Sequence, residues 1–216
     1  MTREETEFKK KRLIEYLEHT YSPRAVLVYG SYARGDNDEY SDFDCMLIAD
    51  EKIIPHDDSV VDGVRLDCFI FTPDETADGE LDAFLTAYDA EIVRDDGTAA
   101  NLKARVRSYV DGYAADEDEK RLVKGWIAKT VERMKKDDEE GAYRGILLLS
   151  ESLSDYCLLR DIFYFGSKQT ISRLKNEDAE GYRLFRAAVT GRTNGEIAAW
   201  ALYAAGISEE SGKTDE

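Results

Sequence analysis

Residues 30–44 read GSYARGDNDEYSDFD and are the most informative stretch of the chain. It follows the apolar run AVLVY at residues 25–29, whose β-branched and aromatic residues predict a buried strand. Gly30 permits a sharp turn and the close approach of a ligand, and Ser31 can cap a helical turn or bond a phosphate oxygen. Free backbone amides at such a helix start, with Arg34 one turn further on, favour an anion.

The next apolar run, FDCMLIA at residues 43–49, predicts a second strand. Asp42 directly precedes this run and Asp44 is its second residue. Side chains two apart on a strand lie about 6.5–7 Å apart on one face, so Asp42 and Asp44 can converge on one cation or on two neighbouring ones. A third strand-like run, VRLDCFIF at residues 64–71, carries Asp67 in its middle. If it pairs with the second strand at about 4.8 Å, Asp67 can join the other two acids.

Three carboxylates at a partly buried site would repel one another and raise their own pKa values unless a divalent cation neutralised them. Oxygen ligands favour a hard ion such as magnesium, which also binds substrate phosphates. The chemistry that uses such a site is in-line phosphoryl or nucleotidyl transfer. One metal ion activates the attacking oxygen and a second stabilises the leaving pyrophosphate.

Over residues 20–97 the chain resembles the nucleotidyltransferases of the polymerase-beta type, whose pattern is a Gly-Ser turn, an acid-apolar-acid triplet and a lone acid on a later strand. Here ten residues separate Ser31 from Asp42. The resemblance implies that Asp42, Asp44 and Asp67 are the catalytic, metal-binding acids and that Gly30 and Ser31 hold the triphosphate. It also implies Mg²⁺ as cofactor and ATP or another NTP as co-substrate.

Each part of this pattern also has a plainer explanation. A Gly-Ser pair before a helix commonly only caps it, and Arg34 could simply meet solvent. Because a buried carboxylate needs a partner, Arg65, on the same strand face as Asp67, could form a purely structural ion pair with it. The order of turn, paired acids and third acid favours the functional interpretation.

The composition of the chain limits the kinds of substrate and partner that it can bind. A formal charge of -17 opposes binding to nucleic-acid backbones, so long polynucleotides are poor substrates and a cationic or neutral acceptor is favoured. No apolar run approaches about 18 residues, and the N-terminus reads as a charged helix, so we expect a soluble, cytoplasmic protein with no membrane partner. Cys45, Cys68 and Cys157 are predicted to be buried free thiols. His19 and His56 are too scattered to indicate a histidine-based mechanism.

The predicted fold class is α/β (α+β), with a small mixed-sheet nucleotidyltransferase-like domain at residues 1–97 and a helical bundle at residues 98–216 that shapes the acceptor site. An amphipathic pattern predicts a helix at residues 4–20. Strand signals nearly vanish after residue 99, where helices are predicted at residues 102–113, 122–134, 143–165, 171–174 and 196–205.

The longest of these, residues 143–165, is expected to run through the bundle core. Glu151 and Asp155 are four residues apart and share a face, so they could line an acceptor pocket or supply a general base for its hydroxyl. They could instead face solvent or pair with Arg144, Arg160 or another basic residue. The general base therefore stays open among Asp67, Glu151 and Asp155.

The turn at residues 166–168, GSK, resembles one that several antibiotic-modifying members carry near the nucleotide, so Lys168 is a candidate phosphate ligand or simply an exposed lysine. The helical domain resembles that of aminoglycoside and lincosamide nucleotidyltransferases. This resemblance implies transfer of AMP from ATP to a hydroxyl of a cationic, antibiotic-like small molecule, and it is compatible with a homodimer.

A second hypothesis is an antitoxin-like nucleotidyltransferase that modifies or binds a partner protein. The spacing of the Gly-Ser turn and the acid pair suits that group, but its members are usually short single domains. A nucleotide-binding module without catalysis is a third hypothesis.

Overall fold

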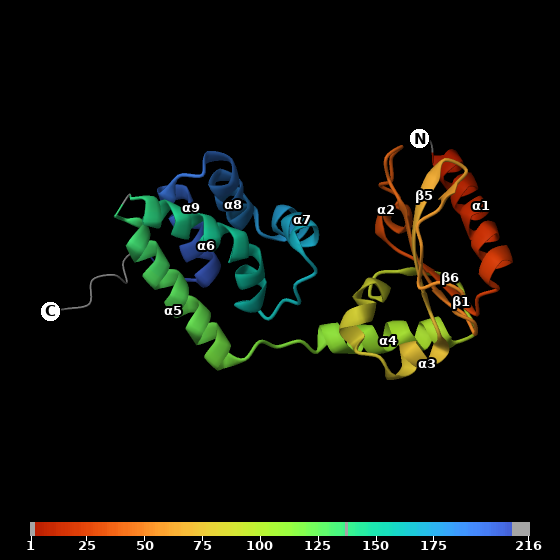
Figure 1. Cartoon of the computed structure of the whole chain (residues 1–216). Coiled ribbons are helices and arrows are strands. Elements are labelled where there is room, and N and C mark those ends of the chain that lie inside the picture. Colours follow the sequence, from red (N-terminus) through yellow and green to blue (C-terminus); the bar gives the residue numbers. More distant parts are fainter. Residues whose placement is uncertain (1–2, 137, 209–216) are drawn as a thin grey trace. The chain divides into compact units, whose positions relative to one another are not determined.

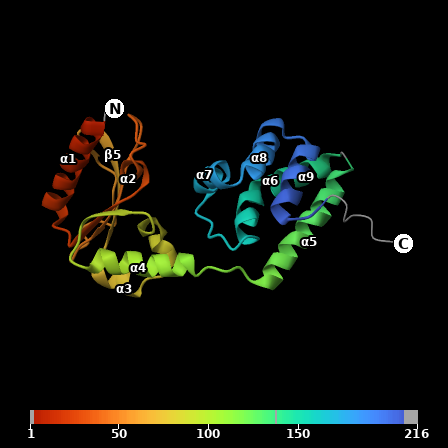
Figure 2. The same ribbon diagram turned by 180° about the vertical axis from the view of Figure 1, so that it is seen from behind.

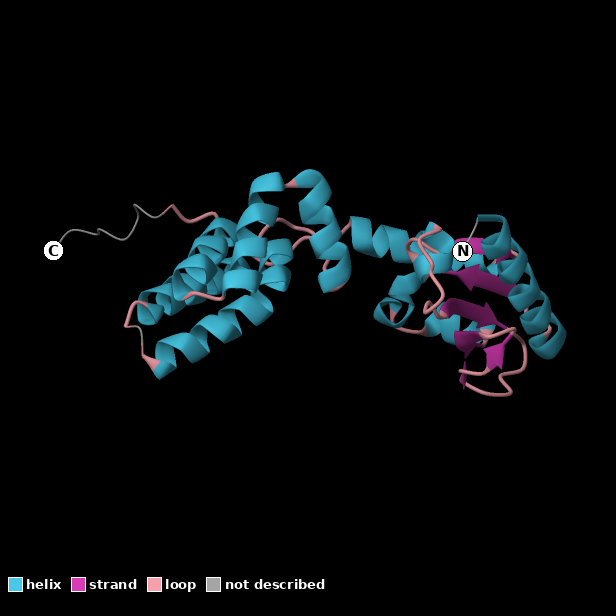
Figure 3. Cartoon of the chain, turned by 90° about the horizontal axis from the view of Figure 1, so that it is seen from above, coloured by secondary structure: helices cyan, strands magenta, loops and turns pink. Residues whose placement is uncertain are grey.

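The structure, a computed structural model, describes residues 3–136 and 138–208. The chain forms two compact units, Met1–Asp111 and Gly112–Glu216, called here the sheet unit and the helical unit. All strands of the described residues lie in the sheet unit, whereas the regular elements described for the helical unit are helices (Figure 3). Within the same residues, no helix has both the length and the apolar character that a bilayer crossing requires.

The sheet unit contains, in chain order, α1 (Arg3–Tyr21), β1 (Ala25–Val28), α2 (Gly30–Arg34), β2 (Phe43–Ile48), β3 (His56–Asp57), β4 (Val60–Val61), β5 (Val64–Phe71), α3 (Pro73–Asp78), the 3₁₀ helix η1 (Leu81–Ala87), β6 (Glu91–Arg94) and α4 (Thr98–Asp111). The helical unit contains α5 (Glu117–Met134), α6 (Glu139–Leu158), α7 (Ser167–Glu177), α8 (Ala179–Gly191) and α9 (Asn194–Ala205).

The strands form one mixed sheet in the order β3-β5-β2-β1-β6, and β4 pairs with β5 beside it. β2 and β5 run parallel, while β1 is antiparallel to both of its neighbours, β2 and β6. The predicted combination of a mixed sheet with a helical second part is therefore confirmed.

The two faces of the sheet are covered by different helices. α1 lies along one face (Figure 1 and Figure 2), where Leu13 and Leu17 pack against alternate residues of β1, β2 and β5, including Phe43 and Cys45. α4 packs against β1 and η1. Because side chains alternate along a strand, Asp44 projects to the face opposite α1. Asp44 therefore lies outside the apolar layer that contains its sequence neighbours Phe43 and Cys45.

The division after Asp111 falls later in the chain than the junction expected near residue 97. Leu102 and Val106 of α4 are buried, so this helix carries an apolar stripe of helical period. Its start is fixed by Asp95, whose carboxylate accepts hydrogen bonds from the backbone of Ala99 at 2.9 Å and of Ala100 at 3.1 Å. The first helix after the sheet thus belongs to the sheet unit.

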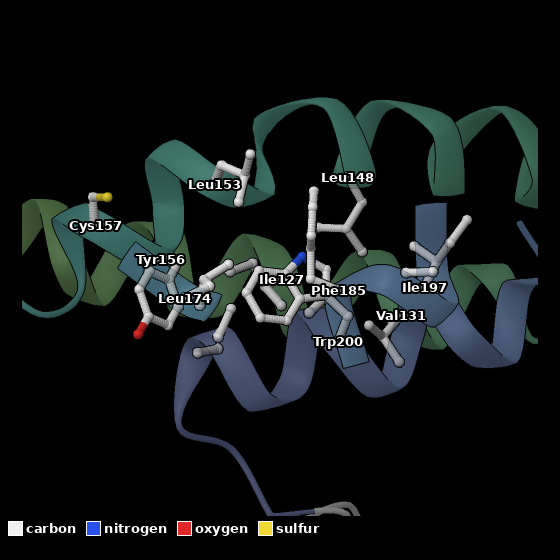
Figure 4. Close-up of a cluster of buried hydrophobic side chains, with 14 of the residues drawn as sticks. Ile127, Val131, Leu148, Leu153, Tyr156, Cys157, Leu174, Phe185, Ile197 and Trp200 are labelled. Carbon is white, nitrogen blue, oxygen red and sulfur yellow. The ribbon is translucent and has the colours of Figure 1, made fainter. Parts of the chain in front are cut away.

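The helical unit has its own core, centred on Trp200, which is fully buried (Figure 4). The rings of Tyr156 and Phe185 lie 5.7 and 5.4 Å from the indole ring. The indole Nε1 donates to Ser152 Oγ at 2.8 Å, so the polar edge of this buried side chain is satisfied.

Among the helix assignments that differ from the sequence prediction, α6 and α8 differ most clearly within the helical unit. α6 ends at Leu158 rather than near residue 165, because Asp161 adopts a left-handed φ of 55° and Ile162 N–H bonds back to the carbonyl of Cys157 at 2.9 Å. α8, at residues 179–191, was not predicted at all. It begins at Asp178, whose carboxylate accepts a bond from the backbone of Gly181 at 2.9 Å.

Candidate active site

The centre of the candidate site is a pair of acids on neighbouring strands. In the parallel ladder of β2 and β5, Asp44 is the register partner of Asp67, and both side chains are half-buried. Adjacent strands are about 4.8 Å apart and residues opposite each other point to the same face, so the two carboxylates lie side by side on one face of the sheet. The predicted pairing of these two strands is confirmed.

Gly30 lies directly against Asp44. Its φ is +66°, and a Cβ built on it would lie 1.9 Å from Asp44 Oδ2, far inside van der Waals contact. Only glycine leaves room for the carboxylate and takes this backbone conformation without strain. Ser31 follows as the second residue of α2, half-buried at the same turn. The turn and the acid pair are therefore one structural unit.

Asp42 lies just before β2, and its side chain is exposed. It borders a hollow of about 220 Å³ whose other walls include Lys9, Tyr32 and Tyr40. Across residues 3–136 and 138–208, no three His, Cys, Asp or Glu side chains come close enough together to hold a metal ion as they stand. The convergence of Asp42 with the other two acids remains a prediction.

Tyr29, the residue before the turn, belongs to the same neighbourhood. Its backbone N–H donates to the carbonyl of Asp44 at 3.0 Å. Burial raises the pKa of the Tyr29 phenol, and nearby Cys45, Asp67 and Asp44 raise it further. The phenol is therefore a neutral hydrogen-bonding group beside both acids. In the sequence this residue only marks the end of a strand.

Asp67 has a partner that the sequence did not indicate. His56 Nε2 lies 2.7 Å from Asp67 Oδ1. Arg65, which the sequence offered as a structural partner for Asp67, pairs with Asp58 at 3.1 Å instead. His56 was overlooked because it stands in an acidic loop with no strand periodicity, and only the fold brings it to β5.

The two other predicted phosphate ligands have different environments. Arg34 is exposed and forms an ion pair with Asp36 at 3.3 Å. Lys168 is exposed in the first turn of α7, in the helical unit. Their contact with phosphate remains a prediction. Cys45, Cys68 and Cys157 are buried free thiols, as predicted.

Glu151 and Asp155 both lie on α6, and neither of the arginines considered as partners serves them. Arg144 pairs with Glu140 at 2.6 Å, and Arg160 donates to the backbone carbonyl of Ala204 at 2.6 Å. Asp155 Oδ2 is buried without a hydrogen-bond partner among the described residues. Burial, with a smaller effect from Glu151, raises the pKa of Asp155 to about 6.

Replacing Asp155 with asparagine is expected to stabilise the protein at neutral pH. The folded state prefers the protonated acid, so the penalty is complete above pH 6 and disappears as the pH falls towards the ordinary value of 3.8. The difference between these pKa values corresponds to at most about 3 kcal/mol, which partial exposure reduces to roughly 1–2 kcal/mol. Urea unfolding at pH 7.5 and pH 4.5 measures it.

The gain from Asp155→Asn should be present at pH 7.5 and mostly lost at pH 4.5. Glu151→Gln on the same helix is the control. It should change the free energy of unfolding by only a few tenths of a kcal/mol, because Glu151 contributes less than burial to the raised pKa of Asp155. An equal gain for both variants, or a gain independent of pH, would contradict burial as the main cause.

Comparison with known proteins assigns the family. No curated protein matches the chain. A structure of a nucleotidyltransferase-like protein from Exiguobacterium sibiricum 255-15 is similar at 11% identity and a TM-score of 0.37, over 93% of this chain and 73% of that chain. The family model described as "Nucleotidyltransferase domain" matches residues 10–156, more than half of the sequence, and this range includes Asp42, Asp44 and Asp67. The chain therefore belongs to the nucleotidyltransferase domain family.

Proposed function

We propose that this protein transfers a nucleoside monophosphate, AMP from ATP, to a hydroxyl group of a small molecule in a magnesium-dependent reaction. The observation that carries the proposal is the register of Asp44 with Asp67 beside Gly30. Two carboxylates side by side, against a turn that tolerates no side chain, suit a nucleotide bound through a metal ion better than a structural core. Family membership supports nucleotidyl transfer in general.

Asp44 and Asp67, joined by Asp42, would hold the magnesium. The chemistry of the donors fits, because Mg²⁺ prefers carboxylate oxygens and keeps places for water and phosphate. Once bound, the metal would neutralise charge on the triphosphate and polarise the phosphorus that is attacked. The carboxylates of these acids supply the negative charge that would hold the metal. Replacing a carboxylate by the amide of the same shape would remove that charge and keep the strand pairing.

Gly30 and Ser31 would hold the phosphates by the backbone of the turn, where the missing side chain allows a close approach. Arg34 would add a positive charge if it exchanged Asp36 for phosphate, and two parallel N–H bonds would make it an effective ligand. Lys168, a residue of the helical unit, is proposed as a further phosphate ligand.

The acceptor is proposed to be cationic or neutral because the chain carries a net charge of -17. An acceptor of the aminoglycoside or lincosamide type is proposed from the resemblance of the helical domain to the nucleotidyltransferases that modify those antibiotics. The general base is one of Asp67, Glu151 and Asp155. Among the residues that the structure describes, the buried Oδ2 of Asp155 has no hydrogen-bond partner, and the pKa of about 6 suits a proton acceptor at neutral pH. A homodimer could complete the acceptor site.

The test is to incubate the purified protein with ATP, Mg²⁺ and a panel of aminoglycosides and lincosamides, and to search for AMP adducts by mass spectrometry. An adduct on a panel member, lost when EDTA is added, supports the proposal. AMP found on a co-purified protein and on no small molecule would favour the antitoxin-like alternative. Absence of every adduct, with no release of pyrophosphate, would overturn the enzymatic assignment.

A further inference from the structure

The short edge strand β3 places two polar side chains on opposite faces of the sheet. Asp57 is 5% exposed and faces the α1 side, where it accepts a hydrogen bond from Tyr21 Oη at 2.8 Å. Its other oxygen accepts from the backbone of Ser59 at 2.9 Å. Because neighbouring residues of a strand alternate, fixing Asp57 on one face fixes His56 on the other, the face of Asp44 and Asp67.

The imidazole of His56 is held in two ways. In the antiparallel ladder His56 is the register partner of Phe69, and their rings lie 4.5 Å apart at 34°. At the ring edge, Nε2 lies 2.7 Å from Asp67 Oδ1. An ionised carboxylate can only accept, so Nε2 carries the hydrogen and donates it. The ring is therefore packed against one neighbour on β5 and bonded to another.

Stability alone is a weak reason for this pair. The side chains of His56 and Asp67 are 36% and 41% exposed, and exposed ion pairs contribute about 0–1 kcal/mol. Arg65 stands on the same face of β5, two residues from Asp67, but is paired with Asp58. Asp67 is thus hydrogen-bonded to the imidazole of His56, which packing against Phe69 has already oriented. It is not bonded to the long, flexible side chain of Arg65.

We propose that His56 is a positioning residue for Asp67. By donating to Oδ1 it fixes the orientation of the carboxylate, so that Oδ2 would be the oxygen available to a bound metal ion. Hydrogen bonds to metal-binding side chains typically change metal affinity or activity by about 10–100-fold. This inference rests on the proposed function, since it assumes a role for Asp67 in metal binding.

The experiment compares the wild type with His56→Ala, His56→Gln and the control Arg65→Gln. A glutamine can place its amide N–H where Nε2 stands, so it restores the hydrogen bond without the ring. Mn²⁺ binding in the presence of a non-hydrolysable ATP analogue is measured by calorimetry. Values of kcat and KM are measured with an acceptor identified by the adduct screen proposed above, and thermal unfolding confirms that each variant is folded.

For His56→Ala we expect Mn²⁺ affinity and kcat to fall by about 10-fold or more, with KM for the acceptor little changed. His56→Gln should recover most of both losses, and Arg65→Gln should match the wild type. Unchanged binding and kcat in His56→Ala, or a glutamine variant as poor as alanine, would overturn the inference alone. A wild type that binds neither Mn²⁺ nor the analogue would overturn the proposed function, and this inference with it.

Discussion

Replacing Asp44 with asparagine is expected to lower the rate of nucleotide transfer by about 10³-fold or more while the protein stays folded. Asparagine keeps the shape of the side chain beside Gly30 but removes the charge that would hold the metal. Since Asp44 is the register partner of Asp67, the substitution also removes repulsion between two adjacent carboxylates. The melting temperature without Mg²⁺ should therefore be equal to or higher than that of the wild type.

Initial rates and thermal unfolding with and without Mg²⁺ and nucleotide check this result. Ligands that bind the folded state raise its stability, so Mg²⁺ with nucleotide should raise the melting temperature of the wild type and not that of Asp44→Asn. Asp78→Asn, at an exposed acid of the same unit at the end of α3, is the matched control for loss of one charge. Transfer by Asp44→Asn at more than a tenth of the wild-type rate would contradict the metal assignment.

The second large effect is expected at Gly30. Alanine there would place its Cβ 1.9 Å from Asp44 Oδ2, so either the carboxylate or the turn must move. We expect Gly30→Ala to reduce transfer by about 10²-fold or more, because a displacement of about 1 Å at a catalytic group has effects of this size. Nucleotide affinity should fall with it.

Gly35 is a matched control for this substitution, since it ends the same short helix. Its φ is +76°, close to that of Gly30, but apart from its own chain neighbours no heavy atom of the described residues lies within 4 Å of the position that a Cβ would take. Both alanine variants bear a strain of about 1–2 kcal/mol from the left-handed backbone, and only Gly30→Ala displaces Asp44. Equal losses of activity in the two variants would show that backbone strain, and not contact with the acid, accounts for the effect.

The core of the candidate site was predictable because its signals are local. The apolar run before Gly30 and the alternating pattern around Asp44 and Asp67 each specify a strand and its faces within a few residues. The sequence led us to consider that β2 and β5 pair, and the structure confirms that they do. Their parallel direction and the register that sets Asp44 opposite Asp67 are shown by the structure alone. Gly30 was predictable as a turn residue, although its contact with Asp44 was not.

What sequence reasoning missed depends on contacts between distant segments. β3 has only two residues, too few for any periodicity, so nothing local placed His56 beside Asp67. Tyr29 could be located at a strand end, but its place beside Asp44 follows from the pairing of β1 with β2, where its backbone N–H donates to the carbonyl of Asp44. In the helical unit, Asp161 ends α6 in a left-handed conformation that asparagine or glycine would have signalled more clearly.

The most direct test of nucleotidyl transfer by this site follows the two ends of the triphosphate separately. The protein is incubated with Mg²⁺, an acceptor and ATP labelled either at the α or at the γ phosphorus. The account predicts that the α label appears on the acceptor and the γ label in pyrophosphate, and that Asp44→Asn yields neither product. Appearance of the γ label on the acceptor, or release of inorganic phosphate without pyrophosphate, would contradict it.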